Sequence, residues 1–475
     1  MPKSDLSSWH MPLRPTTLRC FISIAATLSL VGCKGTDNTG SSPVVEPNAQ
    51  EVVVPVANAK LDYKPVPAGT ALADTVRVRF AIYFLPTPTI RPEKEFKRLV
   101  RSRYSFLSLA PERESGTTPF AVVGAPDMSE FAPPTVETLK YIGRGLSPED
   151  RTAVQASQEA WLVDFSLSQT EAASQHREVM KLMAELAKKT GGLLWDESTR
   201  QLFSHTTWAD RYADWDLNSP KSWSLYTIHS YQDGELQRVV SLGLEKFGLP
   251  DIAVRDVSRG DTVGMTGLIN LVAQTLRSGA KVDEDGVLVV DTKIAPDTWE
   301  LLEGGKGTAK VILAVGERLE GDADNRLWEI VFPGGPESET QSRQQAFLHE
   351  LFGATDEIVH SVHDEELKAA SRLGLVELGA MKEEFQTKWP VGDTLLVKSP
   401  FDTDDGGTEW MWIEVVSWQG EEIKGILQNE PFSISDLKAG ARVESRFDLL
   451  FDYIRHHADG TTTGNGTGVV LSKRE

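Results

Sequence analysis

Cysteine is almost absent from this chain. Only two cysteines occur among its 475 residues, and both lie within the first 33. A scaffold built on disulfides is therefore excluded. Everything after residue 33 is free of cysteine, so that this part of the chain tolerates an oxidising compartment without mispaired thiols.

Positive charge is scarce as well. The chain has 49 Lys and Arg against 69 Asp and Glu, which gives a net charge of −20. Such a polyanion is poorly suited to nucleic acid, because phosphate backbones are bound by basic surfaces. The same charge disfavours docking on anionic lipid and favours a basic protein or a cationic ligand as partner. Hydrophobic residues make up 40% of the sequence, which is enough to build cores.

The apolar run near the N-terminus is too short to cross a membrane. Cys20–Gly32 comprises 13 uncharged residues, whereas a transmembrane helix needs about 20. This length, together with Arg14 and Arg19 before the run, is typical of a signal peptide. The run ends in Leu30-Val31-Gly32-Cys33, and this box resembles the lipobox of bacterial lipoproteins.

The lipobox resemblance implies that residues 1–32 are removed and that Cys33 is acylated, with palmitate among its acyl chains. Two alternatives stay open: an ordinary secretory signal and a short buried helix. Met11 is an alternative start to Met1 and would give a shorter basic segment. We expect a lipid-anchored protein of the bacterial cell envelope that faces the periplasm. Lys34 favours the outer membrane, because many lipoproteins kept at the inner membrane carry Asp at that place.

The remaining sequence divides into three parts that differ in composition and residue pattern. Residues 33–73 are rich in Gly, Ser, Thr, Asn and Pro and predict a flexible tether with a reach of roughly 35 Å. Residues 74–380 interleave strand and helix patterns and predict an α+β body with mixed sheets, in which a break into two subdomains near 205–222 stays open. Residues 385–475 predict a small all-β domain, either a curved sheet or a barrel.

The clearest unit of the body begins with a strand at Ala160–Leu167. Ser168–Glu171 has the pattern of a capping box and predicts a helix start, and Gly191 predicts the end of that helix. Because another strand follows, we expect parallel pairing in this unit. Ser338–Gln341 predicts a second capped helix, and Asp233-Gly234 predicts a hairpin turn.

Four short blocks stand out in the C-terminal part of the chain. They are Met411–Val415, Ile423–Leu427, Asn429–Phe432 and Leu437–Gly440. Their order and spacing resemble the YegJ-like family of bacterial proteins (domain of unknown function 2314). Ala441 departs from the family pattern, in which Asp often stands there, and Phe451–Tyr453 replaces a common Asp-Trp pair. The family carries no assigned activity, so the resemblance implies a domain and not a mechanism.

These blocks supply one set of candidate binding residues. Trp410, Trp412 and Asn429 could line a groove. The alternative is that the blocks specify the fold, since Trp412 and Glu414 share one face of a strand while Ile413 faces the other way.

His360, His363 and Asp364 are weak candidates for a metal site. The two histidines would share one face of a helix. The alternative is a helix N-terminus, where acidic residues complement the helix dipole. We expect no cofactor.

Organised catalytic motifs are missing from the sequence. It contains no G-x-S-x-G elbow, no P-loop, no G-x-G-x-x-G after a strand and no H-E-x-x-H. The prediction is an uncharacterised cell-envelope lipoprotein with a non-catalytic binding or interaction role. One alternative is a periplasmic hydrolase assisted by a metal at His360 and His363. Another is an immunity-type binder of a basic protein.

Overall fold

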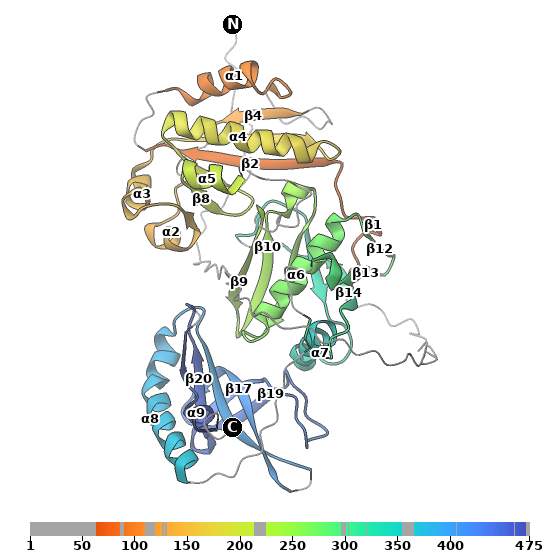
Figure 1. The fold of residues 1–475 in the computed structure, drawn as a ribbon, viewed down its shortest axis with the longest axis vertical. Helices are drawn as coiled ribbons and strands as arrows, with labels where there is room; N and C mark the ends of the chain where they lie inside the picture. The colour runs from red at the N-terminus through yellow and green to blue at the C-terminus, as the bar shows by residue number, and fades with distance from the viewer. Residues whose placement is uncertain are drawn as a thin grey trace, which may run out of the picture.

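The computed structural model describes residues 63–85, 90–109, 119–125, 128, 131–212, 225–295, 301–302, 304–319, 321–353, 365–404, 406–459 and 461–471. Over these residues the protein has the predicted α+β fold. Three large sheets succeed one another along the molecule (Figure 1). We call the parts that carry them the N-lobe (75–212), the middle lobe (225–353) and the C-lobe (365–471). Cys33 and the first part of the predicted tether lie outside the described residues.

The N-lobe is a sheet in the order β3-β4-β6-β2-β7-β8-β5 with helices packed against it. Its strands are β2 (Thr75–Tyr83), β3 (Ser108–Leu109), β4 (Phe120–Gly124), β5 (Gly143–Arg144), β6 (Ala160–Ser168), β7 (Leu193–Asp196) and β8 (Gln201–Phe203). Its helices are α1 (Pro92–Ser102), α2 (Val136–Ile142), α3 (Pro148–Ala153), η1 (Val154–Ala156), α4 (Ala172–Thr190) and α5 (His205–Tyr212).

The middle lobe is a sheet in the order β13-β14-β15-β11-β10-β9. Its strands are β9 (Thr227–Asp233), β10 (Leu236–Leu242), β11 (Asp251–Val257), β13 (Val287–Asp291), β14 (Thr308–Val315) and β15 (Leu327–Val331). Its helices are η3 (Leu244–Phe247), α6 (Thr262–Arg277), η4 (Thr292–Ile294), η5 (Glu337–Glu339) and α7 (Thr340–Phe352). The short strands β1 (Gly69–Thr70) and β12 (Lys281–Val282) pair beside this lobe.

The C-lobe is an open sheet in the order β19-β18-β17-β16-β20-β21. Its elements are α8 (Glu365–Lys388), β16 (Thr394–Asp402), β17 (Thr408–Gln419), β18 (Glu422–Leu427), β19 (Arg442–Arg446), η6 (Phe447–Leu449), β20 (Asp452–His456), β21 (Thr462–Gly464) and α9 (Gly466–Leu471). The sequence predicted β-structure alone for residues 385–475, and the structure adds the short helix α9 there. Helix α8 lies almost wholly before residue 385, in the predicted body, but its Leu378 packs with Ile413 and Tyr453 of this sheet.

The strand–helix–strand unit of the N-lobe differs from its prediction in pairing. Strands β6 and β7 do not pair with each other, because β2 lies between them and is antiparallel to both. Two strands that share an antiparallel neighbour run in the same direction, so the crossover through α4 is kept while the direct pair is lost. Direct parallel pairs occur elsewhere, between β3 and β4, β5 and β8, and β11 and β15.

Both predicted capping boxes are wrong. Ser168 is still paired with Thr75 in the sheet, and α4 begins only after Glu171, which makes no capping hydrogen bond with its side chain. Helix α7 likewise begins beyond Ser338 without a side-chain cap. The other local predictions are confirmed, since Gly191 ends α4 with a φ of 71° and Asp233-Gly234 turns the hairpin of β9 and β10.

The largest apolar core is shared by two of the lobes, and the third lobe lies outside it. One buried cluster runs without interruption from the N-lobe into the middle lobe and includes Phe80, Met183, Val254 and Leu268. The C-lobe has a separate cluster of its own. Within the part of the chain that the structure describes, no helix combines the length and apolar character that a membrane crossing requires.

Candidate functional site

The loop that follows β18 is held in place by three carboxylates. Glu409 accepts hydrogen bonds from the backbone N–H groups of Phe432 and Ser433, with N–O distances of 2.9 and 3.1 Å. Asp404 accepts one from Ser435 at 2.9 Å, and Glu430 accepts one from Ala439 at 3.0 Å. These bonds fix a segment without helix or strand in one conformation. A loop ordered in advance loses less entropy when it binds a partner.

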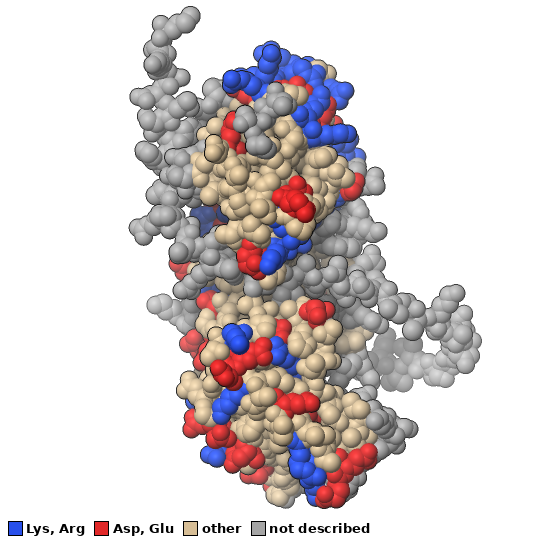
Figure 2. Space-filling model, turned by 90° about the vertical axis from the view of Figure 1, so that its left-hand side faces the viewer, with Lys and Arg blue, Asp and Glu red and all other residues tan. Residues whose placement is uncertain are grey.

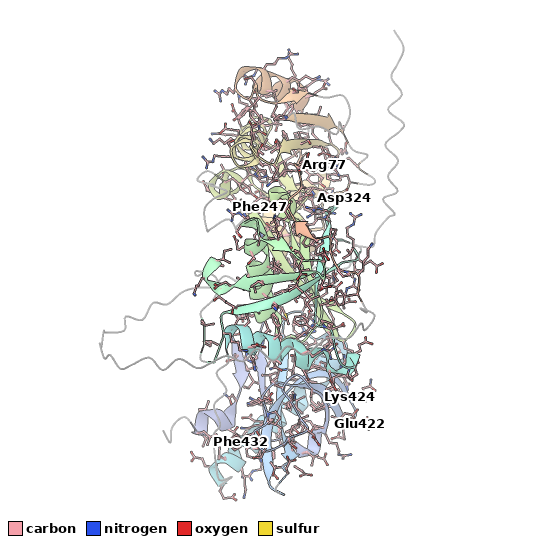
Figure 3. The ribbon with its side chains drawn as sticks, turned by 90° about the vertical axis from the view of Figure 1, so that its right-hand side faces the viewer. Arg77, Phe247, Asp324, Glu422, Lys424 and Phe432 are labelled. Atoms are coloured by element: carbon pink, nitrogen blue, oxygen red, sulfur yellow. The ribbon has the colours of Figure 1, made fainter. Side chains whose placement is uncertain are left out.

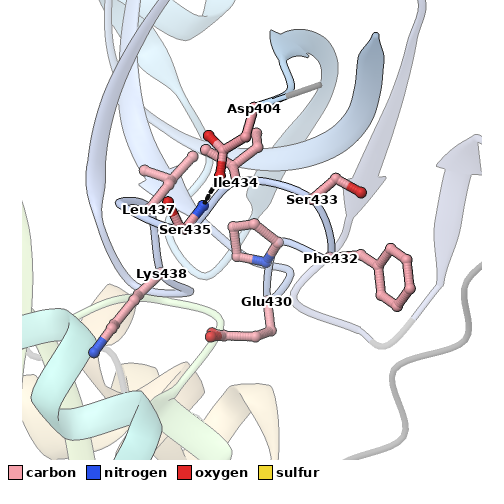
Figure 4. Close-up of a pocket in the computed structure, with 9 residues that line it drawn as sticks. Asp404, Glu430, Phe432, Ser433, Ile434, Ser435, Leu437 and Lys438 are labelled. Carbon is pink, nitrogen blue, oxygen red and sulfur yellow. Dashed lines mark hydrogen bonds between the residues drawn. The ribbon is translucent and has the colours of Figure 1, made fainter. Parts of the chain in front are cut away.

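This loop forms a pocket of about 430 Å³ at the surface of the C-lobe (Figure 4). The pocket is lined by Asp404, Glu430, Pro431, Phe432, Ser433, Ile434, Ser435, Leu437 and Lys438. Its volume falls within the range of small-molecule and side-chain pockets, about 300–1,000 Å³. The bond from Ser435 to Asp404 is drawn in Figure 4 and closes one wall.

Phe432 stands out at the rim of this pocket. Its ring projects away from the loop (Figure 4), and the residue is 69% exposed. In the view of Figure 3 it lies on the opposite side of the C-lobe from Glu422 and Lys424. A large aromatic side chain on a rigid loop is the kind of residue that anchors protein interfaces.

The rim of the pocket is acidic. Asp404 and Glu430 line it and are exposed, and Lys438 is the one basic residue among those that line it. Asp436, also exposed, lies in the chain between two of the lining residues. The arrangement therefore favours a ligand that presents positive charge next to an apolar group.

The three residues predicted to line a groove lie nearby but do not line this pocket. The Asn429 side-chain oxygen accepts a hydrogen bond from the Trp412 backbone at 2.8 Å and so fixes the start of the loop. The Nζ of Lys398 lies 5.6 Å from the centre of the Trp412 ring, and burial lowers the pKa of this lysine. The ring of Trp410 lies 4.9 Å from that of Phe451.

Glu414 joins the C-lobe to the middle lobe. Its two carboxylate oxygens accept hydrogen bonds from the backbone N–H groups of Arg259 and Gly260, at 2.7 and 2.8 Å. Both donors lie just before α6, where N–H groups and the helix dipole favour an anion. Burial raises the pKa of Glu414 to about 7, against the opposite effect of these two N–H groups.

Further contacts of this junction are polar. Gln345 donates to the Gln428 carbonyl at 3.2 Å, and Arg442 donates to the Gln341 side chain at 3.3 Å. Gly440 has a φ of 77°, and a Cβ there would lie 2.6 Å from the Gln341 carbonyl oxygen. Glycine is therefore needed at this position for both backbone conformation and space.

Sequence reasoning missed the role of Glu414 and Gly440 in this junction. One clue was present: Glu414 is a carboxylate between apolar Ile413 and Val415 in a strand, and a buried acid must find donors. Nothing local identified those donors on Arg259 and Gly260, 155 and 154 residues away along the chain.

The predicted metal and lipid sites cannot be placed in the structure. His360, His363 and Asp364 lie outside the described residues, as does Cys33. Among the residues that are described, no group of three or more His, Cys, Asp or Glu side chains is arranged to hold a metal ion.

Comparison with known proteins gives one match. Residues 364–473 match a family model described as an uncharacterised protein conserved in bacteria (DUF2314), which covers the whole C-lobe. The predicted resemblance to domain of unknown function 2314 is thereby confirmed over these residues. No curated protein and no solved structure matches the chain.

Proposed function

We propose that this chain is a non-catalytic lipoprotein of the bacterial cell envelope whose YegJ-like C-lobe binds a basic protein. The observation that carries the proposal is the loop of residues 429–440, which holds the exposed ring of Phe432 beside an acidic pocket. An aromatic anchor surrounded by polar residues is the usual centre of binding energy in a protein interface.

Charge supports a basic partner. Asp404 and Glu430 line the pocket, the exposed Asp436 lies in the same loop, and the chain as a whole carries a net charge of −20. Complementary charge accelerates encounter and selects among partners, and both effects weaken as salt is added. An immunity-type binder is the special case in which the basic partner is a toxin.

The cell-envelope location is supported by the leader. The apolar run Cys20–Gly32, the preceding Arg14 and Arg19 and the box that ends at Cys33 together fit a lipoprotein signal. Mass spectrometry of the mature protein should find an acylated N-terminal Cys33. The variant Cys33→Ala should remain unprocessed and unacylated, and a wild-type protein that keeps residues 1–32 would refute this part of the proposal.

The binding role is tested by crosslinking from the loop. A photoreactive phenylalanine analogue at position 432 should give one discrete protein adduct in the native envelope, and the adducted protein should be basic. The same analogue at Val289, which is 62% exposed on β13, is the matched control and should not give this adduct.

A second variant separates charge from apolar contact. Asp436→Asn removes one acidic group at the rim while leaving the three carboxylates that hold the loop, so the yield of the adduct should fall and its salt dependence should weaken. Equal adducts from positions 432 and 289, or no adduct from 432, would refute the binding role of the loop.

A further inference from the structure

Positive charge gathers on two helices of the N-lobe although the chain as a whole is acidic. Residues 91–103 and α4 together hold ten Lys and Arg against four Glu. Figure 2 shows basic side chains concentrated at the end of the molecule that carries α1, whereas the opposite end is mixed. We call this surface the basic face; its exposed cations are Arg91, Lys94, Arg98, Arg101, Arg103, Lys181, Lys188 and Lys189.

The two helices are joined into one surface by ion pairs. Arg103 of the α1 end pairs with Glu185 of α4 at 2.9 Å, and Lys189 of α4 pairs with Glu95 of α1 at 3.1 Å. The acids of these pairs lie beneath the cations, since the Glu95 and Glu185 side chains are 11% and 21% exposed while that of Arg103 is 65% exposed. The other two acids, Glu93 and Glu178, are 59% and 42% exposed and pair with Lys97 and Lys181. With ten cations against four acids, the face still carries an excess of six positive charges.

We propose that the basic face docks the N-lobe on an anionic phospholipid bilayer. Two helices that pack against each other, with cations along both, offer a broad surface rather than a pocket, which suits a plane of phosphate groups. The net negative charge of the rest of the molecule opposes this only weakly, because charges more than about 8 Å from the membrane are screened at physiological salt. The C-lobe lies at the other end of the molecule (Figure 1).

The expectation that negative charge disfavours anionic lipid therefore applies to the whole chain and not to this face. The proposed acyl anchor at Cys33 would keep the N-lobe close to a membrane, but the docking itself depends on the cations of α1 and α4. The loop around Phe432 lies in the C-lobe and remains available for a protein partner.

The test compares binding of the full chain to vesicles of phosphatidylglycerol with phosphatidylethanolamine and to vesicles of phosphatidylcholine. The test variant carries Arg91→Gln, Lys94→Gln, Arg101→Gln and Lys188→Gln, which lie outside the ion pairs that join the helices. Its preference for anionic vesicles should fall about a hundredfold, since each basic residue near such a surface contributes several-fold. Any contribution of the N-terminal apolar run is common to all variants and cancels in the comparison.

The matched control removes the same charge elsewhere. It carries Lys281→Gln, Lys293→Gln, Lys310→Gln and Lys388→Gln, all at exposed positions. Its preference for anionic vesicles should stay within about threefold of the wild type, because these residues lie outside the basic face. Circular dichroism and thermal unfolding should show that both variants remain folded.

Three outcomes would overturn the proposal. Equal losses in the test and control variants would show a general charge effect. Binding of heparin as tight as that of anionic vesicles would assign the face to a soluble polyanion or an acidic protein. A wild-type chain without preference for anionic vesicles would remove the proposal altogether. Phe432→Ala should leave vesicle binding unchanged, so that the result is independent of the proposed protein-binding loop.

Discussion

The two junctions between the lobes are built in different ways. The N-lobe and the middle lobe share one apolar core, whereas the middle lobe and the C-lobe meet through hydrogen bonds made by Glu414, Gln345 and Arg442. A continuous core makes two parts unfold together, while a polar junction can open without exposing apolar surface. We therefore expect the first two lobes to behave as one body and the C-lobe to be separable from it.

A buried ion pair crosses the apolar junction. Lys246 of η3 in the middle lobe and Asp196 of β7 in the N-lobe are 2.5 Å apart, and both side chains are fully buried. Burial alone would raise the pKa of Asp196, but Lys246 holds that pKa below its usual value. Lys246 also donates to the Leu225 carbonyl at 2.8 Å. The pair thus links the two lobes through side chains that are both buried.

The largest expected effect comes from breaking this pair. Lys246→Met leaves Asp196 buried without its cation and should lower the free energy of unfolding by about 3–5 kcal/mol. Urea denaturation followed by tryptophan fluorescence measures this loss. In the control Lys306→Met, which breaks the exposed pair with Glu350, the loss should stay below about 1 kcal/mol. A loss that small in Lys246→Met would show that the two lobes do not depend on each other.

The next effect concerns the polar junction. Glu414→Ala removes the acceptor of the Arg259 and Gly260 N–H groups and should weaken docking of the C-lobe by about 1–3 kcal/mol. Hydrogen exchange at these two amides should accelerate, while exchange in the core strand β2 stays as it is in the wild type. Glu444→Ala is the control, because Glu444 pairs with Lys424 at the surface. Unchanged exchange at Gly260 would contradict the role of Glu414.

A smaller effect is expected from pH, because the contribution of Glu414 to docking of the C-lobe depends on its protonation. The folded-state pKa of about 7 lies above the ordinary value of 4.5, so the docked form holds the proton more tightly. The contribution of Glu414 to docking is therefore full below about pH 4.5 and declines as the pH rises to about 7. Protection factors at Gly260, measured across this window, should fall in the wild type and stay level in Glu414→Ala.

The apolar junction should show the opposite pH dependence. Burial, with Arg144 nearby, lowers the pKa of His229 from 6.5 to about 4. Stability from this histidine is therefore full above about pH 6.5 and is lost as the pH falls towards 4. The free energy of unfolding of the first two lobes should decline in this range, and His229→Gln should reduce that decline. The same slope in both proteins would assign it to other groups.

The sequence could predict features that depend on neighbouring residues, but not the junctions, which depend on contacts between distant parts of the chain. Strand propensity and turn chemistry are local, so strand β6, the hairpin at Asp233-Gly234 and the end of α4 at Gly191 were predictable. The position of β2 between β6 and β7 depends on residues far apart in the chain, and it was not predictable. The capping box at Ser168 failed for the same reason, because pairing with Thr75 keeps that serine in the sheet.

The candidate site was predictable only in part. Asn429–Phe432 was recognised as a block, and Asn429 and Trp412 do contact each other. The pocket beside them also depends on Asp404 and Glu409, which reach the loop from the hairpin of β16 and β17. Such contacts are set by tertiary packing and leave no mark in local spacing.

The smallest expected effect tests whether an exposed ion pair contributes to the stability of the polar junction. Arg442 of the C-lobe and Glu235 of the middle lobe lie 3.6 Å apart, but their side chains are 47% and 60% exposed. Glu235→Gln should therefore change docking by less than about 0.5 kcal/mol, because solvent and salt screen an exposed pair. Exchange at Gly260 should match that of the wild type at low and at high salt. Faster exchange in Glu235→Gln would show that the exposed ion pair at the rim stabilises the junction, and not the buried carboxylate of Glu414.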